Sequence, residues 1–298
     1  MNRNVLIVGG GFTGLSLAFD LVNKGVKVKV LEADSEVGGL AGTFEVGGQK
    51  LEKFYHHWFN NDQHVMGLID DLGAKDKVRL RATRTGMYYS NKFYRLSSPL
   101  DLLKFKALSF FGRVRLGLLA LKARRIKDWK VLEKISASQW LRDMAGEEVY
   151  QVVWEPLLRG KFGEAAEDVS AVWMWNKLKL RGGSRGSKSE EQLAYFEGGF
   201  RALLDKLVDY IEEHGGQVIT GSEVQKLIIS EQKITGVETA DCVYQANTVV
   251  LTTPLPISAR LLHEHVSKKY LEFGKNAKEF VTKFQWSKII EDYKKILN

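Results

Sequence analysis

The start of the chain combines two apolar runs with a glycine-rich turn and a helical pattern. Residues 5–8 are a short apolar run with β-branched side chains, and the glycine-rich residues 9–14 follow at once. Apolar positions then recur at helical spacing over residues 15–22, and residues 26–31 form a second β-like run closed by Glu32. This order predicts a strand, a helix and a second strand, which together form a dinucleotide-binding βαβ unit.

Each glycine of the turn has its own physical role in such a unit. Gly9 allows the tight turn, Gly11 lets a diphosphate approach the backbone, and Gly14 lets the helix pack closely on the strand. The diphosphate would lie at the helix N-terminus, where free N–H groups and the helix dipole favour an anion. Glu32 follows at about the spacing expected of an acceptor for a ribose 2′-hydroxyl. We therefore expect the three glycines and Glu32 to contact a bound dinucleotide, together with Phe12 and Thr13 in the first helical turn.

The pattern becomes mainly helical from about residue 53 to residue 195. Helical spacing and capping residues mark four segments, namely 62–73, 99–126 with a break near Gly112, 136–144, and 147–158 with Pro156 late in it. Alternation predicts two short strands, 85–90 and 92–96, around a Ser-Asn turn. We expect the tryptophans of this part to pack a helical core, namely Trp154, Trp173 and Trp175.

The α/β pattern returns after residue 195. Gly198 opens a helix that extends to about residue 214, and short strands follow at 218–220, 224–230, 236–239, 241–245 and 248–251. We predict an α/β fold with a Rossmann-like domain, in which a parallel sheet is joined by small antiparallel strands. This domain comprises residues 1–52 and 196–260. A helical domain, residues 53–195, interrupts it, and C-terminal helices occupy residues 261–298.

Composition narrows the class of protein. The 298 residues are 44% hydrophobic and 27% charged, which is an ordinary globular composition with length for about two domains. The single cysteine, Cys242, excludes an intrachain disulfide and a Cys-based metal site, and we interpret it as a half-buried strand residue. No signal-peptide pattern and no stretch of about 18 uninterrupted apolar residues is present. The cytoplasm is the expected compartment.

The net charge of +8 is concentrated between residues 104 and 134. This segment contains ten basic residues and only two acidic ones, Asp128 and Glu133. Apolar residues interleave with the basic residues from residue 102 onward. Two interpretations remain open for residues 102–134: a solvated basic face of core helices, or a surface for an anionic membrane or an anionic substrate. No nucleic-acid-binding motif accompanies the charge, so we expect no nucleic-acid partner.

The opening unit, followed by residues 38–43, resembles the FAD-binding start of the flavin amine oxidase superfamily. Within it, the branch with protoporphyrinogen oxidase, phytoene-desaturase-type enzymes and UDP-galactopyranose mutase is the most similar. A second glycine pair, Gly38-Gly39, separates this group from plain NAD dehydrogenases. The resemblance covers about residues 1–260. Its other segments are residues 52–59, 154–163, 195–200 and 247–254.

The resemblance implies FAD as cofactor and a hydride transfer from a small-molecule substrate to the flavin. The basic and apolar stretch 102–134 suggests that this substrate is apolar or membrane-derived. It adds further cofactor-binding residues, namely Gly38, Gly39, Leu40, Ala41, His57 beside the flavin, Val224 through its backbone, and Thr253. The flavin itself accepts the hydride, so no catalytic side chain is assigned. A metal site needs three or four converging ligands, and the aromatic context of His56, His57 and His64 together with the resemblance argues against one, so we expect no metal. The candidates to meet an anionic substrate are Arg81, Arg84, Arg159, Arg181 and Arg185.

The end of the chain departs from the family pattern. Family members continue with the rest of the substrate domain and a Gly-Asp segment at the flavin diphosphate, and we find neither. Residues 269–298 instead resemble the last helices of a GT-B glycosyltransferase. Two alternatives therefore stay open: a truncated or hybrid flavoprotein-like module without turnover, and a flavin-dependent sugar-nucleotide mutase in polysaccharide synthesis. The sequence leaves the oligomeric state undefined and is compatible with a peripheral position at the inner face of the membrane.

Overall fold

The computed structural model describes residues 4–53, 57–83, 86–96, 98–183, 192–231 and 233–263. The chain separates into two compact units. The first unit comprises residues 1–53 and 204–298, and the second comprises residues 54–203. The predicted tail at 269–298 and the candidates His56, Arg84 and Arg185 lie outside the described residues, and only the backbone of Arg181 is described.

A four-stranded parallel sheet forms the centre of the first unit, in the order β10-β2-β1-β14. The strands are β1 (Asn4–Val8), β2 (Lys27–Leu31), β10 (Gln217–Ile219) and β14 (Thr248–Leu251). Strand β1 lies between β2 and β14, and its Val8 is in register with Leu31 on one side and Leu251 on the other. Because all four strands run in the same direction, their carboxyl ends share one edge of the sheet. Strands β2 and β10 lie on one side of β1, and β14 lies on the other, so the strand order reverses at β1. Open α/β sheets bind ligands at such a point.

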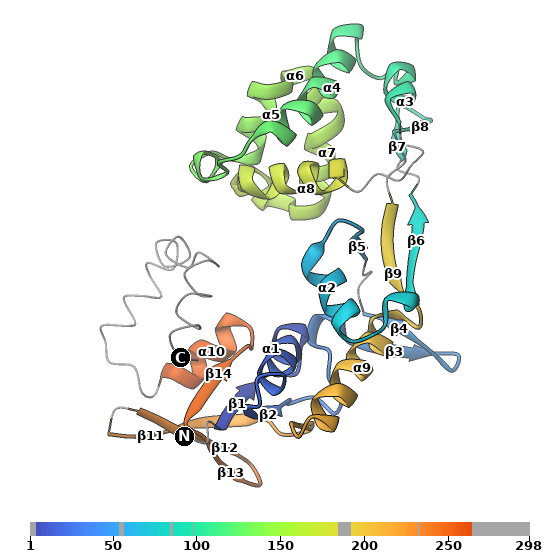
Figure 1. Ribbon diagram of the computed structural model, residues 1–298. Helices are drawn as coiled ribbons and strands as arrows, with labels where there is room; N and C mark the ends of the chain where they lie inside the picture. The colour runs from blue at the N-terminus through green and yellow to red at the C-terminus, as the bar shows by residue number, and fades with distance from the viewer. Residues whose placement is uncertain are drawn as a thin grey trace. The chain divides into compact units, whose positions relative to one another are not determined.

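Helices and a strand meander cover the two faces of this sheet (Figure 1). Helices α1 (Phe12–Val22) and α9 (Gly199–Glu213) pack together, with the rings of Phe19 and Tyr210 4.7 Å apart. The antiparallel meander consists of β11 (Val224–Ser230), β12 (Lys233–Thr239) and β13 (Val243–Gln245). Its buried side chains pack with those of β1 and β2 in one core, which contains Leu6, Val8, Leu31, Val224, Leu227, Val237, Ala246 and Leu261. The predicted α/β class with a parallel sheet and small antiparallel strands is therefore confirmed.

Shorter elements complete the first unit. A 3-10 turn, η1 (Gly39–Ala41), precedes a hairpin of β3 (Thr43–Val46) and β4 (Gln49–Glu52), and α10 (Leu255–His263) follows β14. Cys242 is exposed in the turn between β12 and β13, so the expectation of a half-buried strand residue is wrong. Its backbone closes that turn, since its N–H donates to Thr239 Oγ1 at 3.1 Å and its carbonyl accepts from the Thr239 amide.

The second unit contains a three-stranded sheet of order β5-β9-β6 and a hairpin. The sheet is formed by β5 (Trp58–Phe59), β6 (Val78–Ala82) and β9 (Gln192–Phe196); α2 (Gln63–Asp71) and the 3-10 turn η2 (Lys75–Lys77) lie between β5 and β6 in the chain. The hairpin joins β7 (Gly86–Tyr89) to β8 (Lys92–Arg95). Ser90 and Asn91 both adopt positive φ, 48° and 60°, as a two-residue hairpin turn requires. The predicted Ser-Asn turn is confirmed.

Five helices of the second unit share one apolar core, namely α4 (Phe110–Arg125), α5 (Ala137–Ala145), α6 (Glu147–Val149), α7 (Glu155–Phe162) and α8 (Ala171–Gly183), with the 3-10 turns η3 (Lys130–Leu132) and η5 (Gly163–Asp168). Helix α3 (Pro99–Lys104) precedes α4 and buries no residue. Trp175 is buried, and Trp154 and Trp173 pack against the same core, as predicted. Among the described residues, no helix is both long enough and apolar enough to cross a membrane.

The break in the 99–126 segment lies at residues 105–109, before Gly112 and not at it. Gly112 is in the first turn of α4, where the Ser109 hydroxyl accepts a hydrogen bond from its amide at 3.0 Å. The Glu148 carboxylate also reaches this helix end and accepts from the Ser109 amide at 2.6 Å and from the Ser109 hydroxyl at 2.7 Å. A Cβ at Gly112 would lie 2.8 Å from Glu148 Oε2. The glycine therefore makes room for this carboxylate.

The segment 147–158 is not one uniform helix. A five-residue π-helical turn, η4 (Tyr150–Trp154), lies between α6 and α7, and Pro156 is in the first turn of α7. A proline lacks an amide hydrogen and its ring collides with the carbonyl four residues before it, so an unbroken α-helix is disfavoured here. The wider π turn just before Pro156 relieves this conflict.

We predict that Gly112→Ala destabilises the second unit. The added methyl group displaces the Glu148 carboxylate from Ser109, and losing charge-assisted hydrogen bonds costs about 1.5–3 kcal/mol, of which better helix propensity offsets at most about 1 kcal/mol. Gly117→Ala in the same helix is the control, because its Cβ would meet only Leu102 Cδ2 at an ordinary 3.4 Å. Urea unfolding followed by circular dichroism should show a lower free energy of unfolding for Gly112→Ala than for wild type, and no decrease for Gly117→Ala.

The Glu148 carboxylate also predicts a pH dependence of stability. Hydrogen bonds from the Ser109 amide and hydroxyl hold the pKa of Glu148 below its ordinary 4.5. A folded-state pKa below the unfolded value stabilises the fold above that unfolded value and ceases to do so as the pH falls through the folded pKa. The difference in unfolding free energy between wild type and Glu148→Gln should therefore be full near neutral pH and shrink below pH 4.5. If the unfolding free energies of wild type and Glu148→Gln fell in parallel below pH 4.5, Glu148 would not be the group that causes the pH dependence.

Candidate functional site

The glycine turn between β1 and α1 lies at the carboxyl edge of the parallel sheet. Gly9 has a φ of 110°, a backbone angle that residues other than glycine rarely adopt. Its amide donates a hydrogen bond to the Leu31 carbonyl at 2.8 Å. Gly14 is buried so close to the strand end that an added Cβ would overlap the Gly9 carbonyl oxygen. The close approach of helix and strand that we expected at Gly14 is therefore present.

The first turn of α1 is open where a ligand would approach. Gly11 occupies the N-cap with a φ of −75°, and no side chain caps this end of the helix. A Cβ at Gly11 would meet only the Gly39 Cα, 3.9 Å away. Thr13 is exposed, and the first turn carries no acidic residue. Backbone N–H groups and the helix dipole thus create a site that favours an anion.

Glu32 connects β2 to the glycine turn through its carboxylate. Its Oε2 accepts from the Gly10 amide at 2.6 Å, and its Oε1 accepts from the Asp34 amide at 2.9 Å. Each carboxylate oxygen has a second lone pair, so Glu32 can still accept a hydrogen bond from a hydroxyl group of a ligand. The side chain therefore holds the glycine turn in place and retains the capacity to bind a ribose.

The second glycine pair lies against the first turn. Gly38 has a φ of 135°, and its amide donates to the Gly10 carbonyl at 2.9 Å. Gly39 has a φ of 54° and approaches Gly11. Ala41 is buried, whereas the side chain of Leu40 is 79% exposed. The structure thus brings both glycine motifs together, with the Leu40 side chain facing solvent.

The end of β14 lies beside Gly9 on the other side of the turn. The Thr252 hydroxyl is within hydrogen-bonding distance of two carbonyl oxygens, 3.0 Å from that of Val8 and 3.1 Å from that of Gly9. The methyl group of Thr253 also lies near Gly9, and its hydroxyl shares a hydrogen bond of 2.9 Å with Ser258. The sequence pattern predicted Thr253 and not Thr252, although a threonine directly after an apolar strand is a usable signal.

The remaining candidates are more scattered. Val224 is the buried first residue of β11, and the segment before it approaches Glu32, whose carbonyl accepts from the Ser222 amide at 2.8 Å. His57 belongs to the second unit, where its exposed ring meets that of Phe59 edge-on. Its place beside the flavin stays a prediction. Arg81 is exposed on β6, and Arg159 pairs with Glu155 at 2.8 Å.

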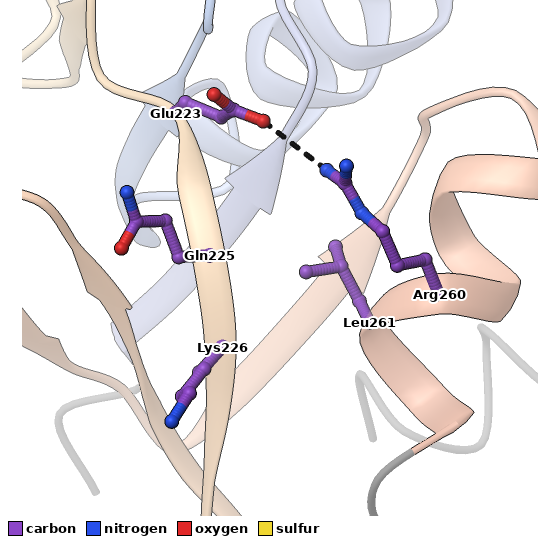
Figure 2. A pocket seen from close by; sticks show the side chains of 5 residues that line it. All are labelled: Glu223, Gln225, Lys226, Arg260 and Leu261. Carbon is purple, nitrogen blue, oxygen red and sulfur yellow. Dashed lines mark hydrogen bonds and ion pairs between the residues drawn. The ribbon is translucent and has the colours of Figure 1, made fainter.

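A pocket of about 310 Å³ lies elsewhere in the first unit, between β11 and α10. Figure 2 shows Glu223 and Arg260 joined by an ion pair of 3.1 Å, with Gln225, Lys226 and Leu261 around them. Both ion-paired side chains are well exposed. Exposed pairs of this kind contribute little to stability, and this pocket does not include the glycine turn.

A polar cluster in the second unit joins the buried Ser138 and Tyr150 to the exposed Glu167. Glu167 accepts from the hydroxyls of Ser138, at 2.6 Å, and Tyr150, at 3.2 Å. The Arg142 guanidinium lies 3.9 Å from the centre of the Tyr150 ring. Burial and the charge of Glu167 raise the pKa of Tyr150, while the Ser138 hydrogen bond lowers the pKa of Glu167. The cluster satisfies its own hydrogen bonds, which is typical of a structural role.

Curated relatives match most of the chain. The coproporphyrinogen III oxidase of Staphylococcus aureus is 24% identical over 85% of this chain and 61% of its own length. The zeta-carotene desaturase of Synechocystis is 25% identical over 91% of this chain and 61% of its own length. The chain thus spans less than two thirds of the length of these relatives.

Solved structures share the fold. An oxidoreductase from Methanosarcina mazei superposes with a TM-score of 0.70 at 21% identity, covering 89% of this chain and 62% of the other. A putrescine oxidase variant gives a TM-score of 0.64 at 19% identity, covering 87% and 59%. These likenesses extend over both units.

A family model agrees with the resemblance found in the sequence. The model of flavin containing amine oxidoreductase matches residues 12–281, which is most of the chain. This family consists of oxidoreductases that use FAD, and the relatives above favour neither of the two alternatives. The predicted superfamily is confirmed, while the likeness of residues 269–298 to a glycosyltransferase stays a prediction. The chain belongs to the flavin-containing amine oxidoreductase family.

Proposed function

We propose that this chain binds the ADP half of FAD at the glycine turn and that the whole protein is an FAD-dependent oxidoreductase acting on a small-molecule substrate. The observation that carries the proposal is the cradle at α1, where Gly11 is open, Gly14 admits no side chain and Glu32 lies beside the turn. Bound FAD would supply the hydride acceptor, so the protein's contribution is binding, orientation and exclusion of water.

The proposed contacts divide according to the parts of the ADP group. The first turn of α1, with Gly11, Phe12 and Thr13, receives the diphosphate, and Glu32 receives the ribose. The second loop, with Gly38, Gly39, Leu40 and Ala41, borders the diphosphate. Val224 meets the adenine through its backbone. Thr253 and His57 complete the proposed set. The open N-cap of α1 and the short distances around Glu32 support these assignments.

We further propose a division of labour along the chain. Residues 1–52 and 196–260 form the cofactor domain, residues 53–195 select the substrate, and residues 261–298 form a C-terminal helical tail. One relative is named for a carotene, an apolar hydrocarbon, which supports an apolar or membrane-derived substrate. We accordingly place the protein in the cytoplasm, in peripheral contact with the inner face of the membrane through residues 102–134.

The cofactor proposal predicts that the purified protein is yellow, with the two absorption bands of oxidised flavin. Gly11→Val should bind FAD about tenfold to a hundredfold more weakly, because it obstructs charge-assisted backbone hydrogen bonds to the diphosphate. An added Cβ at Gly11 meets no close atom, so the variant should fold normally. Gly67→Ala in α2, where a Cβ has nothing within 4 Å, is the control and should retain its flavin. A colourless wild type that gains no FAD on reconstitution would overturn the proposal.

The role of Glu32 can be separated from its support of the Gly10 amide. If Glu32 accepts the ribose 2′-hydroxyl, wild type should bind ADP about fivefold to tenfold more tightly than 2′-deoxy-ADP, the value of one hydrogen bond. In Glu32→Gln both ligands should bind more weakly, and the difference between them should shrink. Calorimetric titration measures all four affinities. Equal affinities of wild type for the two nucleotides would show that Glu32 only supports the turn.

A further inference from the structure

Helix α4 has an apolar stripe on the side that faces away from the protein core. Its core side is formed by Gly112, Leu119 and Ala123, which are buried. The opposite side carries exposed apolar residues at spacings of four, four and three, namely Phe110, Val114, Leu118 and Leu121. Residues at these spacings line one face of an α-helix. We call these four residues, with the neighbouring exposed Phe111, the outer stripe.

Basic side chains border the outer stripe on both sides. At about 100° per residue, Arg115 and Lys122 lie along one border, and Arg113 and Arg124 lie along the other. Arg125 follows at the end of the helix, and α4 contains no acidic residue. Long basic side chains can lay their methylene groups on apolar surroundings while their charged ends reach anionic groups. The outer stripe therefore combines apolar side chains with positive charge on either flank.

The elements next to α4 extend this character. Helix α3 contacts both α4 and β8, and it exposes Leu100 and Leu103. The hairpin exposes Phe93 and Tyr88, whose rings lie 4.8 Å apart. The Arg113 guanidinium donates to the Leu103 carbonyl, which joins the start of α4 to α3. Several exposed apolar side chains thus gather on adjoining elements, which is unusual for a surface that stays in water.

We propose that the outer stripe of α4 lies on an anionic lipid bilayer, with its apolar side chains at the acyl boundary and its bordering Arg and Lys at the headgroups. A helix with an apolar face bordered by basic residues is suited to this interfacial position. A second copy of the chain fits less well, because two outer stripes placed face to face would bring their basic borders together. The proposal specifies the surface through which the proposed peripheral position is achieved, and it rests on that position.

The test is binding of the full chain to vesicles of phosphatidylcholine, alone or mixed equally with phosphatidylglycerol. We expect binding to the anionic vesicles that weakens with added salt. Leu118→Gln with Leu121→Gln, 43% and 52% exposed, should weaken it about tenfold or more. The matched control is Leu157→Gln with Leu80→Gln, 43% and 49% exposed outside the stripe, which should bind like wild type.

The charge requirement has its own variants. Lys122→Gln with Arg124→Gln removes one basic residue from each border and should weaken binding about fivefold per charge. Lys206→Gln with Lys233→Gln removes two exposed charges elsewhere and should have little effect. Vesicle binding that is insensitive to both the apolar and the charge variants of α4 would overturn the proposal.

Two further measurements, sedimentation without vesicles and the flavin spectrum, distinguish a dimer surface from a membrane surface and test the cofactor separately. If the chain self-associates in sedimentation without vesicles, and Leu118→Gln with Leu121→Gln abolishes that association, the outer stripe is a dimer surface and the proposal is overturned. The flavin spectrum is recorded on each sample. Loss of flavin with retained vesicle binding would contradict the proposed cofactor while leaving the membrane surface intact. Retained flavin with no vesicle binding would do the reverse.

Discussion

The contact between the start of α1 and the end of β1 is the constraint on which the first unit depends. A side chain at Gly14 would overlap the Gly9 carbonyl oxygen, so only glycine lets the helix begin directly over the strand. Thr252 and Glu32 then hold the turn from the two flanking strands, through the Val8 and Gly9 carbonyls and the Gly10 amide. The result is a helix N-terminus aimed at the carboxyl edge of the sheet, where an anion is stabilised.

The second unit is stabilised differently, by a helical core with polar groups that satisfy one another. Glu148 fixes the start of α4 through Ser109, and Glu167 joins Ser138 to Tyr150. Both carboxylates have a lowered pKa because they accept hydrogen bonds as anions. This core occupies one side of α4, which leaves the other side, with its apolar and basic residues, at the surface.

Local pattern was sufficient where the physical cause is local. The βαβ unit and the Ser-Asn hairpin followed from runs, turns and glycines that are adjacent in sequence. The break in the 99–126 segment was misplaced because a glycine inside a helical pattern looks like an interruption. Only Glu148, which is distant in sequence, shows that Gly112 makes room for a carboxylate. The π turn before Pro156 was missed because a single turn with i→i+5 hydrogen bonds leaves almost no trace in an apolar pattern.

The sequence by itself determined the family, the cofactor class and the residues of the first glycine turn, because a backbone that must approach a diphosphate closely requires glycine at fixed positions. The tertiary structure decided which neighbours hold that turn. Thr252 reaches it from the end of β14, 243 residues after Gly9 in the chain. It also decided which face of α4, in the basic segment, is buried. Apolar residues on two opposite faces of α4 are indistinguishable in a linear pattern, and only packing shows which face is buried.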